Sequence, residues 1–438
     1  MWMPILLLVL ACGDFAVSAD PVEAVPAVTR VRWTAEDSGV VWVEWGLDAT
    51  LGRATPPVAS PGPEHEVLLV GPGASTSIVY QAVLRTDEGD VLRSAPRTLT
   101  TGAGPVDLPR LVTLDGSGPA SGWALTSTLG QPSYHLLLSP EGTPAWWSPA
   151  GADRVGAQQR VAPDGGSVWT NVAGLDFSED VSALVRVGWD GAELARVAAP
   201  GGHHDFDIAA DGTLGYLAID VRRHDGHDVV GDALIELDPE SGATRTVWST
   251  WDDLPVTVTP ETDTGFYPQG LDWTHANSVT WDPRDDLWLV SLRNTSQILA
   301  ISREGDVVWS MGADGSREGV GLARAFTGQH SPEWTADRRL LLFDNGADGE
   351  TARAVAFAVD EAAGTYTETW AYDAGGRHTT WLLGDVTELP NGNALIAWGN
   401  AGLINEVSPA GEVVWQVNTG VGHVVGFTQA VAQPGAAP

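Results

Sequence analysis

Three segments of the chain begin with histidine and reach an aspartate seven positions later. They are HDFDIAAD from His204, HANSVTWD from His275 and HSPEWTAD from His330. In each segment the aspartate precedes a polar turn and another apolar run, so we expect it at the hairpin end of a strand. The histidines then lie at the opposite ends of three equivalent strands. If these strands repeat radially, their imidazoles meet at one end of a shared axis.

A cationic side chain is expected beside these histidines. An antiparallel hairpin after HANSVTWD brings Arg293 opposite or diagonal to His275. The same pairing in the next repeat brings Asn345, from the segment FDNG, near His330, although a bulge would shift this register. One guanidinium among three imidazoles makes a pocket suited to a tetrahedral oxyanion.

Two other interpretations of the histidines remain open. Three imidazoles with an open position can bind zinc, but the fixed charge of Arg293 would repel a metal dication. Each histidine could also simply hydrogen-bond to the backbone at the edge of its sheet. Three histidines in register with an arginine favour an anion site instead, without a metal or other cofactor.

The elements that must position these residues are strands throughout. Residues 20–107 alternate in short strands, with Trp33 in an early strand and Tyr80 in a later one, and this pattern predicts a small fibronectin type III-like β-sandwich. Residues 102–109 form a linker rich in Gly and Pro. Residues 108–438 repeat at intervals of roughly 40 to 70 residues, each unit holding apolar strands and a turn such as Asp-Gly or Asn-Gly.

We count six such units. Their starts lie near Arg110, Val155, His203, Thr274, Gln329 and Leu383. The tail segment GFTQAV could add a strand to the first unit and close the ring. The predicted fold class is therefore all-β, a six-bladed β-propeller preceded by a fibronectin type III-like sandwich. The recurring tryptophans near the unit ends are expected to be wedges between blades, with a quinone-cofactor role as the alternative.

Composition limits the partners of the protein. There are 57 acidic and 23 basic residues, and the net charge of −34 disfavours nucleic acid and anionic membrane surfaces as partners.

Residues 1–19 contain an apolar run that ends in VLAC, which is typical of a lipoprotein signal, although no positive charge precedes it. Cys12 is the only cysteine, so it is the expected lipidation site and no internal disulfide forms.

This signal predicts an exported protein, either a periplasmic or a cell-surface lipoprotein that meets the membrane only through a lipid anchor. The sequence leaves the oligomeric state open, a homodimer included.

Several motifs in order resemble those of the bacterial arylsulfate sulfotransferase family. They are HHDFD at 203, DWTHANSV at 272, VSLRNTSQI at 290, QHSPEW at 329, LLLFDNG at 340 and GDVTELPNGN at 384. The resemblance covers about residues 200 to 420, and the family's six-bladed propeller with an N-terminal β-sandwich agrees with the organisation above. Some exported members of that family carry a disulfide near the site, which this chain with its single cysteine cannot form.

The resemblance implies a transfer of a sulfuryl group from a phenolic sulfate ester to a phenol acceptor, without a nucleotide sulfate donor. His330 falls on the family nucleophile, which stores the group as a sulfohistidine. His275 and Arg293 match the residues that bind the sulfuryl group. His204 is the candidate to move a proton to and from the phenol, and its neighbour His203 is less favoured by register.

Further side chains are candidates for substrate binding. Asn277 and Asn345 could orient a sulfuryl oxygen, or could only form hydrogen bonds at strand ends. Trp273, Phe326 and Trp334 flank the site in sequence and could provide aryl walls, although each residue type is more often core. The alternative function is a non-catalytic, surface-anchored propeller that binds a sulfated or other anionic ligand.

Overall fold

A computed structural model describes residues 15–108, 111–115, 122–130, 132–174, 181–313, 315–322, 324–347, 349–419 and 423–435. The predicted lipidation site Cys12 lies outside the described residues, so the export signal stays a prediction. The first strand begins at Val17, inside the predicted leader of residues 1–19. Strands dominate the described ranges, which include only short helical elements such as α1 (Thr250–Asp253) and η2 (Gly399–Ala401). No helix in these ranges is long and apolar enough to cross a membrane.

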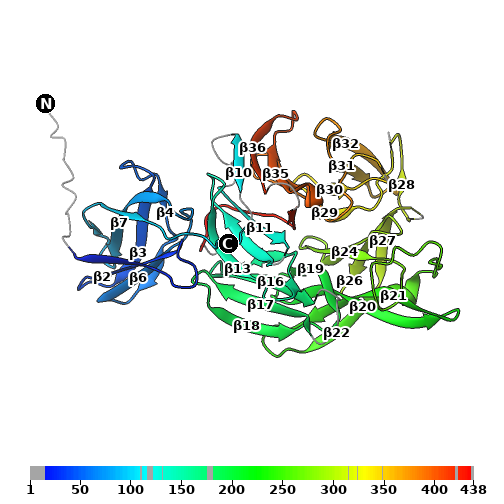
Figure 1. The fold of residues 1–438 in the computed structure, drawn as a ribbon, viewed down its shortest axis with the longest axis horizontal. Helices are drawn as coiled ribbons and strands as arrows, with labels where there is room; N and C mark the ends of the chain where they lie inside the picture. The colour runs from blue at the N-terminus through cyan, green and yellow to red at the C-terminus, as the bar shows by residue number, and fades with distance from the viewer. Residues whose placement is uncertain are drawn as a thin grey trace.

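Two antiparallel sheets at the N-terminal end enclose a common core (blue in Figure 1). Alternate residues of strand β3 point into that core, as a half-buried strand requires. Trp33, Trp45 and Tyr80 are buried there. The strands are β1 (Val17–Pro21), β2 (Thr29–Thr34) and β6 (Glu64–Leu69) in one sheet, and β3 (Gly39–Gly46), β4 (Arg53–Ala54), β5 (Val58–Ser60), β7 (Ser77–Thr86), β8 (Val91–Arg93) and β9 (Arg97–Thr100) in the other.

Six further sheets follow along the described chain, and we number them one to six. The first three cover residues 123–272, with the C-terminal strands added to sheet one. Sheet one holds β11 (Trp123–Leu129), β12 (Tyr134–Leu138), β13 (Pro144–Pro149), β37 (Val424–Val425) and β38 (Gln429–Val431). Sheet two holds β14 (Arg154–Val155), β15 (Gln159–Val161), β16 (Ser167–Gly174), β17 (Ala183–Gly188) and β18 (Glu193–Ala198). Sheet three holds β19 (Gly202–Ile208), β20 (Leu214–His224), β21 (His227–Leu237), β22 (Thr244–Ser249) and β23 (Leu271–Asp272).

Sheets four to six contain residues 276–418 and one strand from the start of the repeat region. Sheet four holds β24 (Ala276–Asp282), β25 (Leu287–Leu292), β26 (Gln297–Ser302) and β27 (Val307–Gly312). Sheet five holds β28 (Glu318–Gly319), β29 (His330–Trp334), β30 (Arg339–Asp344), β31 (Arg353–Asp360) and β32 (Thr365–Tyr372). Sheet six holds β33 (Asp385–Glu388), β34 (Ala394–Ala397), β35 (Leu403–Val407), β36 (Val413–Asn418) and β10 (Val112–Asp115).

The two ends of the repeat region exchange strands. β38 pairs with β11 of sheet one, which confirms the strand predicted from the tail segment GFTQAV. β10, from the start of the region, pairs with β36 of sheet six, which the sequence did not predict. In Figure 1 the red strand β36 accordingly lies beside the cyan strand β10. Backbone hydrogen bonds therefore hold the end of the repeat region in sheet one and its start in sheet six.

Tryptophans near the ends of the units connect neighbouring sheets, as the wedge prediction requires. The indole N–H groups of Trp146 in sheet one, Trp370 in sheet five and Trp415 in sheet six each donate to a carbonyl group of the next sheet around the array. The acceptors are Gly188, Pro409 and Pro140, at 3.3, 3.3 and 3.1 Å. Each indole thus fills an intersheet gap with apolar surface and also satisfies its polar group.

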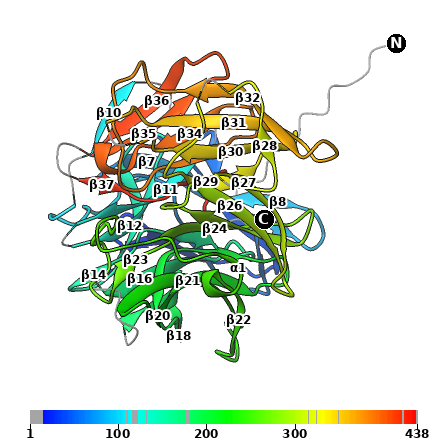
Figure 2. The same ribbon diagram turned by 90° about the vertical axis from the view of Figure 1, so that its right-hand side faces the viewer.

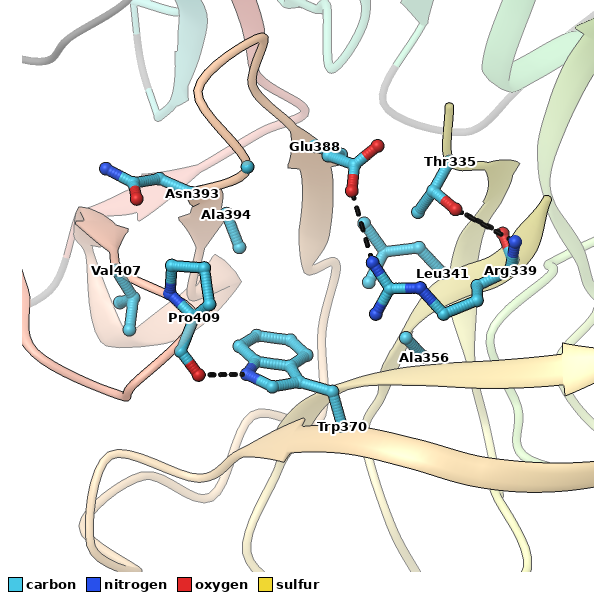
Figure 3. A pocket seen from close by; sticks show the side chains of 11 residues that line it. Thr335, Arg339, Leu341, Ala356, Trp370, Glu388, Asn393, Ala394, Val407 and Pro409 are labelled. Carbon is cyan, nitrogen blue, oxygen red and sulfur yellow. Dashed lines mark hydrogen bonds and ion pairs between the residues drawn. The ribbon is translucent and has the colours of Figure 1, made fainter. Parts of the chain in front are cut away.

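A pocket between sheets five and six surrounds Trp370 (Figure 3). Arg339 reaches across it with Nη2 3.3 Å from Glu388 Oε1 and Nε 2.9 Å from Asp337 Oδ1. The apolar lining consists of Leu341, Ala356, Ala394, Val407 and Pro409. The arginine is already neutralised by two carboxylates, and none of the described lining residues is a histidine. This pocket is therefore separate from the predicted site.

One edge strand of each of the six sheets lines a second, shared pocket, which we call the axial pocket. The edge strands are β38, β15, β19, β24, β29 and β33. In the same order they contribute Gln429, Arg160, Asp207, Trp281, Glu333 and Asp385. In Figure 2, β24 and β29 lie near the middle of the view. The predicted histidines stand at the beginnings of the same strands, so they belong to the other end of this axis.

Glu333 in the axial pocket holds a proton to unusually high pH. Burial, together with the negative charge of Asp385, raises the pKa of Glu333 to about 8. The unfolded chain loses this proton near pH 4.5 and the folded chain only near pH 8, so stability falls as the pH rises through that interval. We expect Glu333→Gln to raise the free energy of unfolding above pH 8 by about 1 to 2 kcal/mol relative to wild type.

Urea unfolding at about pH 5 and about pH 9 measures this effect of Glu333. The exposed Glu412→Gln variant removes one carboxylate outside the pocket and serves as the control. If both variants lost stability with pH in parallel with wild type, the assignment of the retained proton to Glu333 would be wrong.

Candidate active site

Bulges at the beginnings of three inner strands set the directions of the histidines. The pairing of β19, β24 and β29 with the following strand is interrupted at each bulge. His204 and His275 lie in the left-handed region with φ of 50°, whereas in β29 this conformation falls on Ser331, one residue after His330. Such a conformation costs a non-glycine residue roughly 1 to 2 kcal/mol. The left-handed residue is therefore displaced by one position in β29, relative to the two other strands that carry the predicted histidines.

His204 lies at the centre of a buried imidazole cluster. Its ring centroid is 5.0 Å from those of both His203 and His275. Its Nδ1 is 2.8 Å from Nδ1 of His203, so one ring donates and the other accepts. Burial lowers the pKa of His204 well below its ordinary value, and its electrostatic interactions with His275, His203, His330 and Arg293 lower it further. The predicted side chains therefore do converge, and His203 joins them.

His330 closes the cluster from sheet five. It is 2% exposed, and its Nδ1 lies 2.8 Å from Oδ1 of Asn345. Burial lowers the pKa of His330 to about 3, with the charges of Arg293 and His275 adding to that effect and the hydrogen bond to Asn345 opposing it. The nucleophile predicted from the resemblance is therefore neutral throughout the physiological pH range.

Arg293 adds a fixed positive charge beside the imidazoles. Its backbone N–H donates to the carbonyl of His275 at 3.1 Å, which confirms the predicted hairpin pairing. The guanidinium donates to Oδ1 of Asn294 at 3.2 Å and to the carbonyl of Trp381 at 3.4 Å, both neutral acceptors. In the described part of the chain no carboxylate forms an ion pair with Arg293. Its charge is therefore available to an anion.

An open pocket leads from solvent to Arg293. It is lined by loop residues between sheets three, four and five. Thr257, Thr264, Asp272, Trp273, Gly328 and Gly346 are among them. Its described lining includes Arg293 and none of the histidines. Within the described ranges, no three His, Cys, Asp or Glu side chains are arranged to hold a metal ion.

The sequence did not reveal the aromatic residues that contact the histidines. Phe266 and Tyr267 belong to the segment between α1 and β23, and their rings lie 4.5 and 5.6 Å from the ring of His275. Trp381, whose carbonyl accepts from Arg293, is 65% exposed. These residues lie in segments outside the strand repeat, so no periodic signal marks them. Their positions beside the histidines and Arg293 are seen only in the folded structure.

Two carboxylates that contact the histidines were also not predicted from the sequence. Asp272 places Oδ2 2.7 Å from Nδ1 of His275. Asp232 places Oδ1 3.2 Å from Nε2 of His203, while its Oδ2 accepts the backbone N–H of Ala276 at 2.8 Å. Asp272 stands three residues before His275 in the quoted motif DWTHANSV, which was a usable signal.

The two predicted asparagines form hydrogen bonds to other groups of the protein. The amide nitrogen of Asn345 donates to the carbonyls of Thr380 and Leu383, each at 2.8 Å. Both of its amide hydrogens are thereby used, so the expectation that Asn345 orients a sulfuryl oxygen is wrong. Asn277 is fully buried and donates to the carbonyl of Gln329 at 2.7 Å. Asn277 thus links β24 to the start of β29, and its contact with substrate stays a prediction.

The predicted aryl walls are placed in three different environments. Phe326 packs in a core with Phe357, with ring centroids 5.9 Å apart, so it does not line the site. Trp334 lines the axial pocket, at the other end of the strand that begins with His330. Trp273 alone lines the pocket beside Arg293, although only 2% of it is exposed. The order of residues along the chain could not distinguish these outcomes.

The fold and site define an all-β protein whose antiparallel sheets hold a buried histidine cluster and an unpaired arginine at one end of their axis. The arylsulfotransferase (ASST) family matches residues 191–429, more than half of the chain. The protein therefore belongs to this family. Membership supports aryl sulfotransferase activity in general, with an aryl sulfate donor and a phenol acceptor.

Solved structures with a similar fold are distant in sequence. A protein of unknown function from Bacteroides caccae is 15% identical, with 70% of this chain and 98% of that chain covered and a TM-score of 0.47. A streptogramin B lyase is 12% identical, with coverage of 70% and 86% and a TM-score of 0.40. A protein of unknown function from Bacteroides thetaiotaomicron is 11% identical, with coverage of 94% and 98% and a TM-score of 0.39. Comparison with curated proteins gave no match.

Proposed function

We propose that this protein transfers a sulfuryl group from a phenolic sulfate ester to a phenol through a sulfohistidine on His330. The observation that carries the proposal is the convergence of the buried rings of His204, His275 and His330 beside the partly exposed Arg293. A sulfate monoester presents one negative charge spread over its oxygens. The unpaired guanidinium of Arg293 and the imidazole donors beside it match that charge.

In the first half-reaction, a ring nitrogen of neutral His330 forms an N–S bond as the S–O bond to the phenolate breaks. His330 is suited to this step because burial keeps its lone pair free of a proton. The charge that spreads over the sulfuryl oxygens is stabilised by Arg293 and His275, which are already in place and need no reorganisation.

His204 handles the phenol proton in this scheme. In the empty site it is neutral, which suits it to accept the proton of the acceptor phenol in the second half-reaction. A bound anionic ester offsets the surrounding positive charge and favours the protonated form of His204, which can then protonate the departing phenolate. In the second half-reaction the phenol oxygen forms the new S–O bond as the N–S bond to His330 breaks.

Trp381 is our candidate to hold the aryl ring of donor or acceptor. It is the most exposed tryptophan among the described large apolar residues, and its backbone contacts Arg293. A stacked aromatic pair contributes about 1 kcal/mol. We expect Trp381→Ala to raise KM for aryl sulfates roughly fivefold with kcat nearly unchanged. Steady-state kinetics measures this, and a loss confined to kcat would argue against the assignment.

The proposed function is tested with the purified wild-type protein, an aryl sulfate and a phenol. Release of the donor phenol, formation of a new aryl sulfate and a sulfuryl adduct in the intact mass are expected. Absence of both adduct and turnover across a panel of aryl sulfates would reject the proposal. Saturable binding of the ester without chemistry would favour a non-catalytic anion-binding protein instead.

We also propose how the sheets are grouped into blades and domains and how the protein is exported. Residues 112–431 are best described as six blades, because edge strands of six sheets line one axial pocket and strands are exchanged across the seam. The two N-terminal sheets that share Trp33 and Tyr80 support a fibronectin type III-like module. Export as a lipoprotein anchored at Cys12 is proposed from the sequence motif VLAC, and lipid analysis of the expressed protein tests it.

A further inference from the structure

Two histidines of the site present Nδ1 to acceptors that differ in charge. His330 faces the neutral amide oxygen of Asn345 at 2.8 Å, and His275 faces a carboxylate oxygen of Asp272 at 2.7 Å. Both acceptors are almost fully buried, at 4% and 1% exposure. The environments therefore differ in the charge of the acceptor and not in access of water.

The orientation of the Asn345 amide is determined by its other partners. Its nitrogen lies 2.8 Å from the carbonyl oxygens of both Thr380 and Leu383. Reversing the amide would place its oxygen against these two carbonyl oxygens, with no hydrogen between them. Oδ1 is therefore the atom that faces His330, and Nδ1 of His330 must be the donor. A neutral imidazole with its proton on Nδ1 has its lone pair on Nε2.

Asp272 presents a negative charge to His275. Burial opposes ionisation of Asp272, but the hydrogen bond and charge of His275 outweigh burial and lower the pKa of Asp272. Thr264 supports the same oxygen, with its hydroxyl 2.5 Å from Oδ2. A carboxylate acceptor stabilises a positive imidazolium, whereas an amide acceptor does not. The neutral and charged acceptors thus favour different protonation states in two neighbouring rings.

We propose that Asn345 and Asp272 are positioning residues that assign different roles to the two histidines: Asn345 keeps Nε2 of His330 free to attack sulfur, and Asp272 places a negative charge behind His275, the ring that binds the sulfuryl oxygens. This inference rests on the proposed sulfuryl transfer and adds the identity of the attacking atom. It also explains why an amide, and not a carboxylate, stands behind the nucleophile, since an imidazolium has no lone pair with which to attack.

The other charged groups near His330 do not reverse this assignment. Arg293 and His275, from sheet four, and His204, from sheet three, disfavour a proton on His330 or are themselves neutral. Within sheet five, Asp344 is held by Arg353 at 2.8 Å. From sheet six, Asp385 accepts the backbone N–H of Thr428 at 2.6 Å, and burial raises its pKa.

The first test measures the tautomer of the wild-type protein directly. Nitrogen-15 chemical shifts of His330 are expected to show a protonated Nδ1 and an unprotonated Nε2 at neutral pH, with the signal assigned by its loss in His330→Ala. A proton on Nε2 would overturn the inference. This readout is taken on the wild-type protein and needs no turnover, so it is independent of the proposed activity.

The second test exchanges the acceptor charge in Asn345→Asp and follows adduct formation in a single turnover across pH. A carboxylate behind His330 is expected to move the acidic limb of the rate profile upward by about one to three pH units from its position near pH 3, which slows the reaction at about pH 4 roughly 2- to 100-fold and leaves the rate at about pH 7 nearly unchanged. The rate should recover as the pH rises. An equal loss at every pH, with the limb unmoved, would show a merely structural role and reject the proposal.

Asp272→Asn is the reciprocal variant. Loss of the anionic acceptor is expected to raise KM for the aryl sulfate about tenfold or more and to weaken binding further as pH rises. The matched control for Asn345→Asp is Asn405→Asp. Asn405 is also buried, and it accepts the indole N–H of Trp398 at 2.9 Å, outside the histidine cluster. The control must leave the pH profile unshifted. If wild type forms no adduct, the proposed function fails; if wild type reacts and the profiles do not move, only this inference fails.

Discussion

His330→Ala is expected to abolish the sulfuryl adduct and to reduce transfer at least about 1,000-fold. The reason is chemical, because no other side chain in the cluster is both neutral and supplied with a lone pair directed by an amide acceptor. His204 is neutral too, but His203 contacts its Nδ1. Intact mass after incubation with an aryl sulfate, and release of phenol, measure the two effects.

A buried histidine outside the site provides the control for His330→Ala. His135 is 1% exposed, and its Nδ1 lies 3.2 Å from the amide oxygen of Gln159. His135→Ala removes the same volume from a similar environment, so it reports the structural cost alone. If both variants kept the adduct, or if both lost activity to the same extent, His330 would not be the nucleophile.

Arg293→Met is expected to lower kcat/KM for the aryl sulfate about 100- to 1,000-fold. Methionine keeps an unbranched apolar stem while it removes the charge and the forked donors. Arg293 donates to neutral oxygens, so its loss leaves no carboxylate unpaired among the described residues and the fold should persist. Arg293→Lys should recover only part of the rate, because an ammonium cannot provide two parallel donors.

The control for Arg293→Met is Arg377→Met, which removes an exposed cation from the loop before sheet six. It tests whether the overall charge of the protein, rather than the local guanidinium, attracts the anionic substrate. Kinetics at low and high salt separate the two, since the attraction of distant charges is screened. Equal losses in both variants would reject a specific role of Arg293 in binding the sulfuryl group.

The strands of the repeat region could be predicted because their signal is local. Alternating apolar residues and Asp-Gly or Asn-Gly turns predict hairpins from a few neighbouring positions, and five predicted unit starts lie at or beside the beginnings of β14, β19, β24, β29 and β33. The exchange of β10 into sheet six was not predictable in the same way. That pairing joins residues about 300 positions apart, and nothing in the four residues of β10 specifies their partner.

Within the site, the sequence by itself determined which reactive side chains start the inner strands, because strand periodicity carries His204, His275 and His330 to one end of an axis. Tertiary structure alone decided how each would behave. Three features depend on contacts between distant segments. They are the bulge in β29 that is displaced by one residue, the two carbonyls that orient Asn345, and the loop that brings Phe266 onto His275. Hydrogen bonds and ring contacts require placement to a fraction of an ångström, which residue spacing does not specify.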